Sequence, residues 1–115
     1  MDLSWNNLIG GLPVDISKCT HMSHLDLNNN HFFGHIPGWL GNFCGLGELK
    51  HSFNEFNGTI TSRLGNCTSL LTLTLDNNKL SGSLPRKVEN LVSLNVLYLQ
   101  KNKFFALIPS SIKKL

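Results

Sequence analysis

A group of cysteine and histidine residues near the start of the chain has a spacing that suggests metal binding. Cys19, His21 and His24 lie close together in the sequence, and thiolate and imidazole groups are common zinc ligands. The sequence repeats every 24 residues, however, and this frame places His24 just before a strand and His21 on an outer connection. The ligands of one ion must converge on one point. We therefore expect no metal site and no cofactor.

Three cysteines, Cys19, Cys44 and Cys67, raise the question of a disulfide. Cys19 and Cys67 share a repeat position but lie two coils apart, a distance of about 10 Å at the usual strand spacing. A disulfide requires Cα atoms closer than about 7 Å. Cys44 is one residue out of phase with both. We expect three free thiols, with Cys19 and Cys67 replacing leucine in the core.

Two N-glycosylation sequons begin at Asn57 and Asn66. Their positions in the repeat place both side chains on the surface, away from the predicted inner sheet. A glycan at either asparagine would leave that sheet accessible to a partner. We expect both sites to be glycosylated in a secreted parent protein and unused in a chain that is never secreted.

No set of residues has the pattern of a catalytic site. The glycine-rich stretch 41–47 lacks the Lys-Ser/Thr of a phosphate-binding loop, and the kinase signatures are absent. The net charge of +3 is too small and too scattered to indicate nucleic-acid binding. No apolar run is long enough to span a membrane. We expect no enzymatic activity from this chain.

A repeat of 24 residues, which runs through the chain without an insertion, positions all of these side chains. Alternating leucines such as Leu73 and Leu75 predict a strand with one buried face. About twenty residues separate successive strands, a connection length typical of parallel pairing. The expected strands lie near residues 1–4, 24–28, 48–52, 72–76 and 96–100.

The rest of each repeat predicts a turn, an extended segment and a short outer helix. An asparagine follows every strand, and its amide can satisfy backbone groups in its own coil and the next. These residues form an expected ladder of Asn6, Asn30, Asn54, Asn78 and Asn102. Glycine at the tenth position suits a tight bend, and proline at the thirteenth suits an extended segment. Apolar residues spaced by three then fit a 3₁₀ or irregular helix.

His51 interrupts this pattern, because it occupies an inward position that holds leucine in the other repeats. A buried imidazole without a hydrogen-bond partner costs about 1–3 kcal/mol. We interpret His51 as a local defect of the third repeat. A pH-sensitive packing site is the alternative.

The repeat resembles the plant-specific class of leucine-rich repeats, of the form LxxLxLxxNxLxGxIPxxLGxLxx. Its clearest copies are HLDLNNNHFFGHIPGWLGNF and LTLTLDNNKLSGSLPRKVENLVSL, and LVSLNVLYLQKNKF looks like the late repeats of the Gassho group of plant receptor-like kinases. The resemblance implies an α/β fold, a right-handed horseshoe segment with a parallel sheet on its concave face and 3₁₀ or irregular segments outside. The single domain would comprise repeats 1–24, 25–48, 49–72, 73–96 and 97–115.

The expected concave face carries varied polar and aromatic side chains, which suit a peptide or protein partner. The candidate interaction residues are Asp26, Asn28, Glu48, Lys50, Phe53, Thr74, Asp76, Tyr98 and Gln100. Receptors that this chain resembles bind peptides on this face and recruit a co-receptor kinase near their late repeats. The paired arginines with which many of them hold a peptide carboxylate have no counterpart, because Arg63 and Arg86 fall on the outer side.

The ends of the chain show neither the family's amino-terminal cap nor a signal peptide. We expect an internal part of a longer ectodomain at the extracellular face of the plasma membrane, with uncapped ends prone to end-to-end self-association. The leading hypothesis is a protein-interaction module of a plant receptor-like kinase or receptor-like protein, with any kinase domain outside this chain. An inhibitor of the polygalacturonase-inhibitor type and a truncated product without independent activity are the alternatives.

Overall fold

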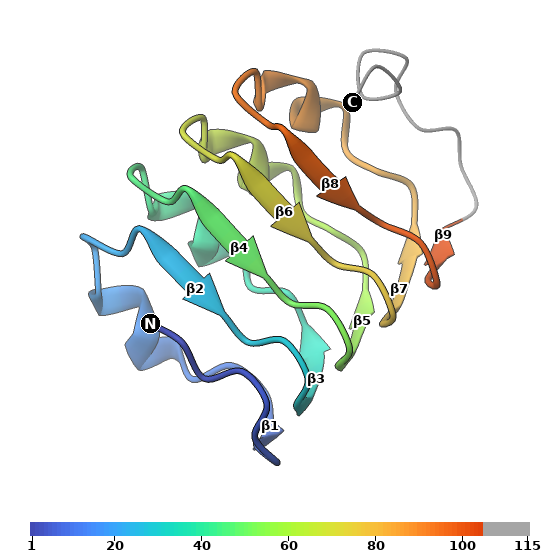
Figure 1. Cartoon of the computed structure of the whole chain (residues 1–115). Coiled ribbons are helices and arrows are strands. Elements are labelled where there is room, and N and C mark those ends of the chain that lie inside the picture. Colours follow the sequence, from blue (N-terminus) through green and yellow to red (C-terminus); the bar gives the residue numbers. More distant parts are fainter. Residues whose placement is uncertain (105–115) are drawn as a thin grey trace.

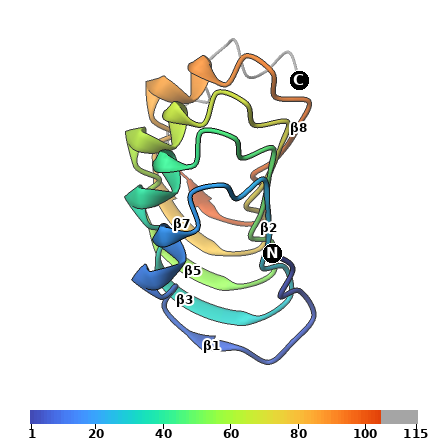
Figure 2. The same cartoon turned by 90° about the vertical axis from the view of Figure 1, so that its left-hand side faces the viewer.

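The computed structural model describes residues 1–104, which form a stack of coils with three sides (Figures 1 and 2). The first side is a parallel sheet of four strands in the order β2-β4-β6-β8. Its strands are β2 (His24–Asp26), β4 (Glu48–Lys50), β6 (Thr72–Thr74) and β8 (Val96–Tyr98). We call this the first sheet.

The predicted strands of the first sheet are confirmed in position and direction, but they are shorter than expected. Residues 1–4 contribute only an isolated bridge between Asp2 and Asp26 instead of a strand. Hydrogen bonds between coils nevertheless continue past the strand ends, for example from the Leu27 N–H to the Lys50 carbonyl at 2.7 Å. The backbone pairing between coils therefore continues beyond the residues assigned to the strands.

A second parallel sheet forms another side of the coils, where the sequence predicted only a bend (Figure 2). Its order is β1-β3-β5-β7-β9. Its strands are β1 (Ile9–Gly10), β3 (His31–His35), β5 (Glu55–Gly58), β7 (Lys79–Gly82) and β9 (Lys103–Phe104). The bend is present as well, since Gly34 and Gly58 adopt positive φ values of 86° and 75°, a region that glycine enters readily.

Short 3₁₀ helices form the third side and confirm the outer segments predicted from the spacing of apolar residues. They are η1 (Val14–Lys18), η2 (Gly38–Asn42), η3 (Ser62–Asn66) and η4 (Arg86–Asn90). A proline in extended conformation precedes η1, η2 and η4. Thr61 precedes η3 with φ −79° and ψ 152°, so the missing proline leaves the backbone path unchanged. The matching part of the fifth predicted repeat, 105–115, lies outside the described residues.

One hydrophobic core fills the space between the three sides. Leu25, Leu49 and Leu73 stack along it with at most 1% of their surface exposed. Neighbouring 3₁₀ helices approach closely at Gly41 and Gly65, where an added Cβ would lie 2.2 and 2.4 Å from a carbonyl oxygen of the next coil. Only glycine permits this spacing between coils.

The three cysteines are all free thiols. Cys67 is buried as expected, its Sγ lies 3.1 Å from the Leu40 carbonyl, and burial raises its pKa to about 11. The expectation that Cys19 is buried is wrong. Cys19 is exposed because, within the described residues, its coil has a neighbouring coil on one side only.

Candidate functional site

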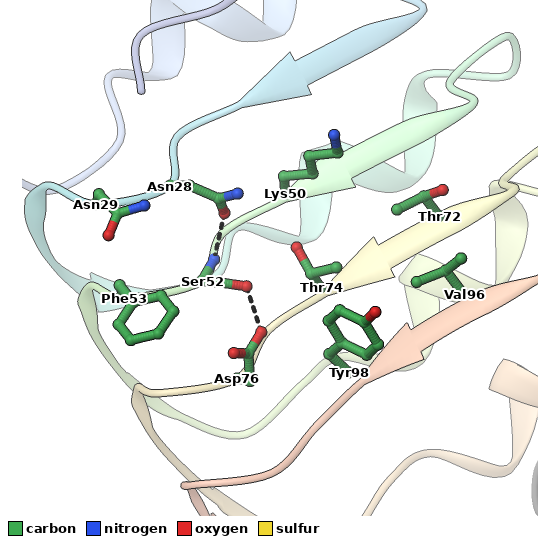
Figure 3. A pocket seen from close by; sticks show the side chains of 10 residues that line it. All are labelled: Asn28, Asn29, Lys50, Ser52, Phe53, Thr72, Thr74, Asp76, Val96 and Tyr98. Carbon is green, nitrogen blue, oxygen red and sulfur yellow. Dashed lines mark hydrogen bonds between the residues drawn. The ribbon is translucent and has the colours of Figure 1, made fainter. Parts of the chain in front are cut away.

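An open hollow of about 440 Å³ lies on the outward face of the first sheet (Figure 3). Its walls come from four successive coils and combine polar, aliphatic and aromatic side chains. They are Asn28, Asn29, Lys50, Ser52, Phe53, Thr72, Thr74, Asp76, Val96 and Tyr98. We refer to this site as the hollow.

Strand alternation explains why these side chains meet. Lys50, Thr74 and Tyr98 end their strands and point outward, while the next residue along the chain points into the core. Two residues beyond, Ser52 and Asp76 point outward again. The same position in each coil thus contributes to one wall of the hollow.

Most of the interaction residues proposed from the sequence do line the hollow: Asn28, Lys50, Phe53, Thr74, Asp76 and Tyr98. Asp26, Glu48 and Gln100 lie on the same sheet side but outside the lining. Four further lining residues, Asn29, Ser52, Thr72 and Val96, were directed to this face by the repeat but were not selected as interaction candidates. Each shares a repeat position with a selected candidate, so the repeat phase gave no reason to prefer one over the other.

A chain of hydrogen bonds crosses the floor of the hollow from coil to coil. The Ser52 N–H donates to Asn28 Oδ1 at 2.7 Å, and the Ser52 hydroxyl donates to Asp76 Oδ1 (Figure 3). The second carboxylate oxygen of Asp76 accepts a bond of 2.8 Å from the Asn77 side-chain amide. These bonds fix the carboxylate at the centre of the site.

Two polar groups at this floor keep unused hydrogen-bonding capacity. Thr74 is 6% exposed, and its Oγ1 has no partner among residues 1–104. Asp76 is 5% exposed, and no cationic side chain within the described part of the chain forms an ion pair with it. The nearby Lys50 Nζ instead lies 3.8 Å from Glu48. Buried groups of this kind favour an added partner.

Aromatic rings stand on both sides of Asp76. Figure 3 places the carboxylate between the rings of Phe53 and Tyr98, which are 52% and 49% exposed. Phe53 has a φ of 57°, in the left-handed region that a bulky residue rarely adopts. The equivalent residues Trp5, Asn29, Asn77 and Lys101 have the same positive φ, so this conformation belongs to the turn of the repeat and not to the hollow alone.

The asparagine row, which consists of Asn6, Asn30, Asn54, Asn78 and Asn102, runs inside the turn that follows the first sheet. Asn54 is typical: its Nδ2 donates to the Leu27 and His51 carbonyls at 2.8 and 3.3 Å. Its Oδ1 accepts from the Phe32 N–H at 3.1 Å. The bonds therefore join each coil to the preceding one, and not to the next one as expected. Every polar atom of this amide is used by the backbone.

His51 is fully buried, and neither ring nitrogen has a hydrogen-bond partner in residues 1–104. Its ring stacks on Phe56 with centroids 5.1 Å apart. Burial lowers the pKa of His51 to about 4, so the ring is neutral at pH 7. The residue lies behind the first sheet and does not line the hollow.

The candidate glycosylation sites lie outside the hollow. Asn57 lies on β5 and Asn66 ends η3, and both are exposed. Among residues 1–104 no group of histidine, cysteine and acidic side chains converges as a metal site would require. The same residues contain no helix with the length and apolar character needed to cross a membrane.

Known proteins share the repeat and the coiled fold described above. The sequence profile of the family described as Leucine Rich Repeat matches residues 21–43, 69–91 and 93–115. No curated protein matches the chain. Many solved structures do.

Three solved plant structures illustrate this similarity. The ectodomain of the receptor kinase GASSHO1/SCHENGEN3 from Arabidopsis thaliana, in complex with CASPARIAN STRIP INTEGRITY FACTOR 2, is 47% identical over 98% of this chain, with a TM-score of 0.94. The peptide hormone receptor RGFR1 in complex with RGF2 is 37% identical over 95%, with a TM-score of 0.90. The BIR3–SERK2 complex from Arabidopsis thaliana is 32% identical over 100%, with a TM-score of 0.95. The chain spans 14%, 18% and 62% of those three chains.

Proposed function

Because the chain belongs to the leucine-rich repeat family, we propose that it is a non-catalytic protein-interaction module that binds an extended peptide on the first sheet. The observation that carries this proposal is the hollow, where exposed aromatic rings surround buried polar groups with unused capacity. Binding sites typically combine such apolar anchors with a few fixed polar groups.

The similar structures favour a receptor over an enzyme inhibitor. GASSHO1/SCHENGEN3 and RGFR1 were each solved with a bound factor or hormone, and BIR3 was solved with SERK2. We propose by analogy that this chain is part of an extracellular receptor region that binds a peptide and a co-receptor. A kinase domain of the parent protein would lie outside this chain.

Glycosylation of the parent fits the same proposal. Asn57 and Asn66 lie on the second sheet side and the 3₁₀ side, so glycans there would leave the first sheet free. When the chain is secreted from plant cells, its mass should increase by two glycans, and glycosidase treatment should remove both. The variants Thr59→Ala and Thr68→Ala should each lose one, and an unchanged mass in the original chain would reject this part of the proposal.

The test of peptide binding uses a displayed library of random heptapeptides selected on the folded chain. We expect the selected peptides to lose affinity for Tyr98→Ala, which removes an exposed ring of the hollow. The matched control Val92→Ala removes a side chain that is 83% exposed and lies beyond η4, away from the hollow. Selected peptides that bind both variants as they bind the original chain would contradict the proposal, as would a selection that yields no binder.

A further inference from the structure

Charge is distributed unevenly between the first sheet and the rest of the molecule. The whole chain has a net charge of +3, with ten basic and seven acidic side chains. Four of those seven acids lie along the first sheet: Asp2, Asp26, Glu48 and Asp76. Within residues 1–104, Lys50 is the only lysine or arginine on these strand positions, and Lys101 lies at the rim. The sheet face is thus acidic on a basic protein.

Nearby cationic groups balance these acidic side chains only in part. Hydrogen bonds from the Ser4 hydroxyl and N–H hold the pKa of Asp2 below its usual value. Lys50 approaches Glu48 at 3.8 Å, and the His24 ring lies 4.0 Å from the same carboxylate. Asp26 and Asp76 have no such neighbour among the described residues. Asp76 and Lys50 are the charged residues that line the hollow, so attraction of a cationic ligand there comes from Asp76, with Asp26 and Glu48 acting from outside the lining.

Thr74 gives a second and independent indication of a ligand. Its hydroxyl is buried, lacks a partner and lines the hollow, and Figure 3 shows its oxygen pointing toward Lys50 across the floor. A threonine hydroxyl offers both a donor and acceptors. A polar group of a bound peptide backbone would satisfy it.

The Phe53 and Tyr98 rings favour a cation over a neutral group. They flank Asp76 in Figure 3, and each exposes about half of its surface. Lysine and arginine side chains are attracted to aromatic faces, and their aliphatic stems pack against rings without loss of hydration of the charged end. An acidic side chain at the same place would meet the Asp76 carboxylate and be repelled.

We infer that the hollow recognises a lysine or arginine side chain of an extended peptide, seated between Phe53 and Tyr98 with its charge on Asp76. This inference rests on the proposed function and specifies its ligand. The coils from Asn28 to Tyr98 span three strand spacings, or roughly 14 Å, which about four extended residues cover. A heptapeptide is therefore long enough to place a central basic residue in the hollow.

The experiment measures the affinity of the whole chain for heptapeptide pools that are identical except for a fixed central lysine, glutamine or glutamate. We expect the lysine pool to bind about tenfold or more tightly than the glutamine pool, and the glutamate pool to bind most weakly. Asp76→Asn should remove the preference for lysine. The matched control Asp15→Asn makes the same charge change on η1 and should keep it.

Tyr98→Leu provides a second variant that keeps an exposed apolar side chain, and it should reduce the lysine preference by a few fold. Equal binding of the three pools at the hollow would overturn the inference and leave the proposed function intact. A lysine preference that survives in folded Asp76→Asn and in Tyr98→Leu would also overturn it. If no pool binds the original chain, both the inference and the proposed function are wrong.

Discussion

Two rows of polar side chains run across the coils only two residues apart, and they use their atoms differently. In the asparagine row, the side-chain amide of a residue such as Asn54 forms all its hydrogen bonds with the backbone of two coils. In the floor of the hollow, the side chains of Ser52 and Asp76 bond to other side chains, and the Thr74 hydroxyl has no partner in residues 1–104. We infer that the first row stabilises the fold and that the second is available to a ligand.

The largest expected effect concerns the asparagine row. Asn54→Ala would leave the Phe32 N–H and the Leu27 carbonyl without these partners in the interior. The free energy of unfolding should fall by about 2–5 kcal/mol in urea melts. Asn6→Ala is the control, because Asn6 is exposed and bonds only within its own coil. A loss as small for Asn54→Ala as for Asn6→Ala would remove the distinction between the rows.

His51 extends the comparison to a buried polar group with no partner. Its pKa is about 4 in the folded chain and near 6.5 when unfolded, so the unfolded chain binds more protons between these values. The free energy of unfolding should therefore decrease as the pH falls, by about 2 kcal/mol at pH 5 and about 3 kcal/mol at pH 4. Urea melts at several pH values measure this loss. His51→Leu should abolish it, whereas His31→Leu, which changes an exposed residue, should retain it.

At pH 7 the same replacement tests whether His51 is a defect. His51→Leu restores the inward leucine of the other repeats and removes two unpartnered nitrogens. The free energy of unfolding should rise by about 1–3 kcal/mol. Binding of the heptapeptide pools should stay unchanged, because His51 does not line the hollow. Equal or lower stability of the variant would show that the stacking on Phe56 compensates for the missing hydrogen bonds.

The smallest expected effect separates stability from binding at a single residue. Phe53→Asn places a residue that tolerates positive φ where the backbone requires it, as Asn29 and Asn77 already do. Thermal melts should show a gain of up to about 1 kcal/mol, while the lysine pool should bind a few fold more weakly. The reverse control, Asn29→Ala, should lower stability. Stability and binding that change together at Phe53 would argue against a strained binding residue.

The sequence predicted the parts of the fold that repeat strongly. The first sheet, the outer 3₁₀ helices and the inward leucines follow from spacings of two, three and 24 residues. The second sheet was missed because strands such as β5 bury one main apolar side chain, Phe56, and bend at a glycine, so no alternation is visible. The exposure of Cys19 depends on how many neighbours its coil has, which the residue's own position in the repeat does not specify.

The sequence predicted which way the side chains of the candidate site point, but not how deeply they are buried. Repeat phase correctly directed Thr74 and Asp76 outward, yet it gave no indication that both are more than nine-tenths buried. Burial depends on the side chains of neighbouring coils, and the residues that line the hollow differ from coil to coil. The bond from Ser52 to Asp76 likewise needs residues 24 positions apart and a defined side-chain rotamer.

The central claim, that the hollow binds a peptide while the asparagine row holds the fold, is tested most directly by mapping the contact. Amide N–H spectra of the chain would be recorded during titration with one lysine-centred heptapeptide. We predict the largest shifts at Lys50, Phe53, Asp76 and Tyr98, with little change in η2, η3 and η4. Shifts concentrated on those 3₁₀ helices, or no shifts around the hollow at saturation, would contradict the account.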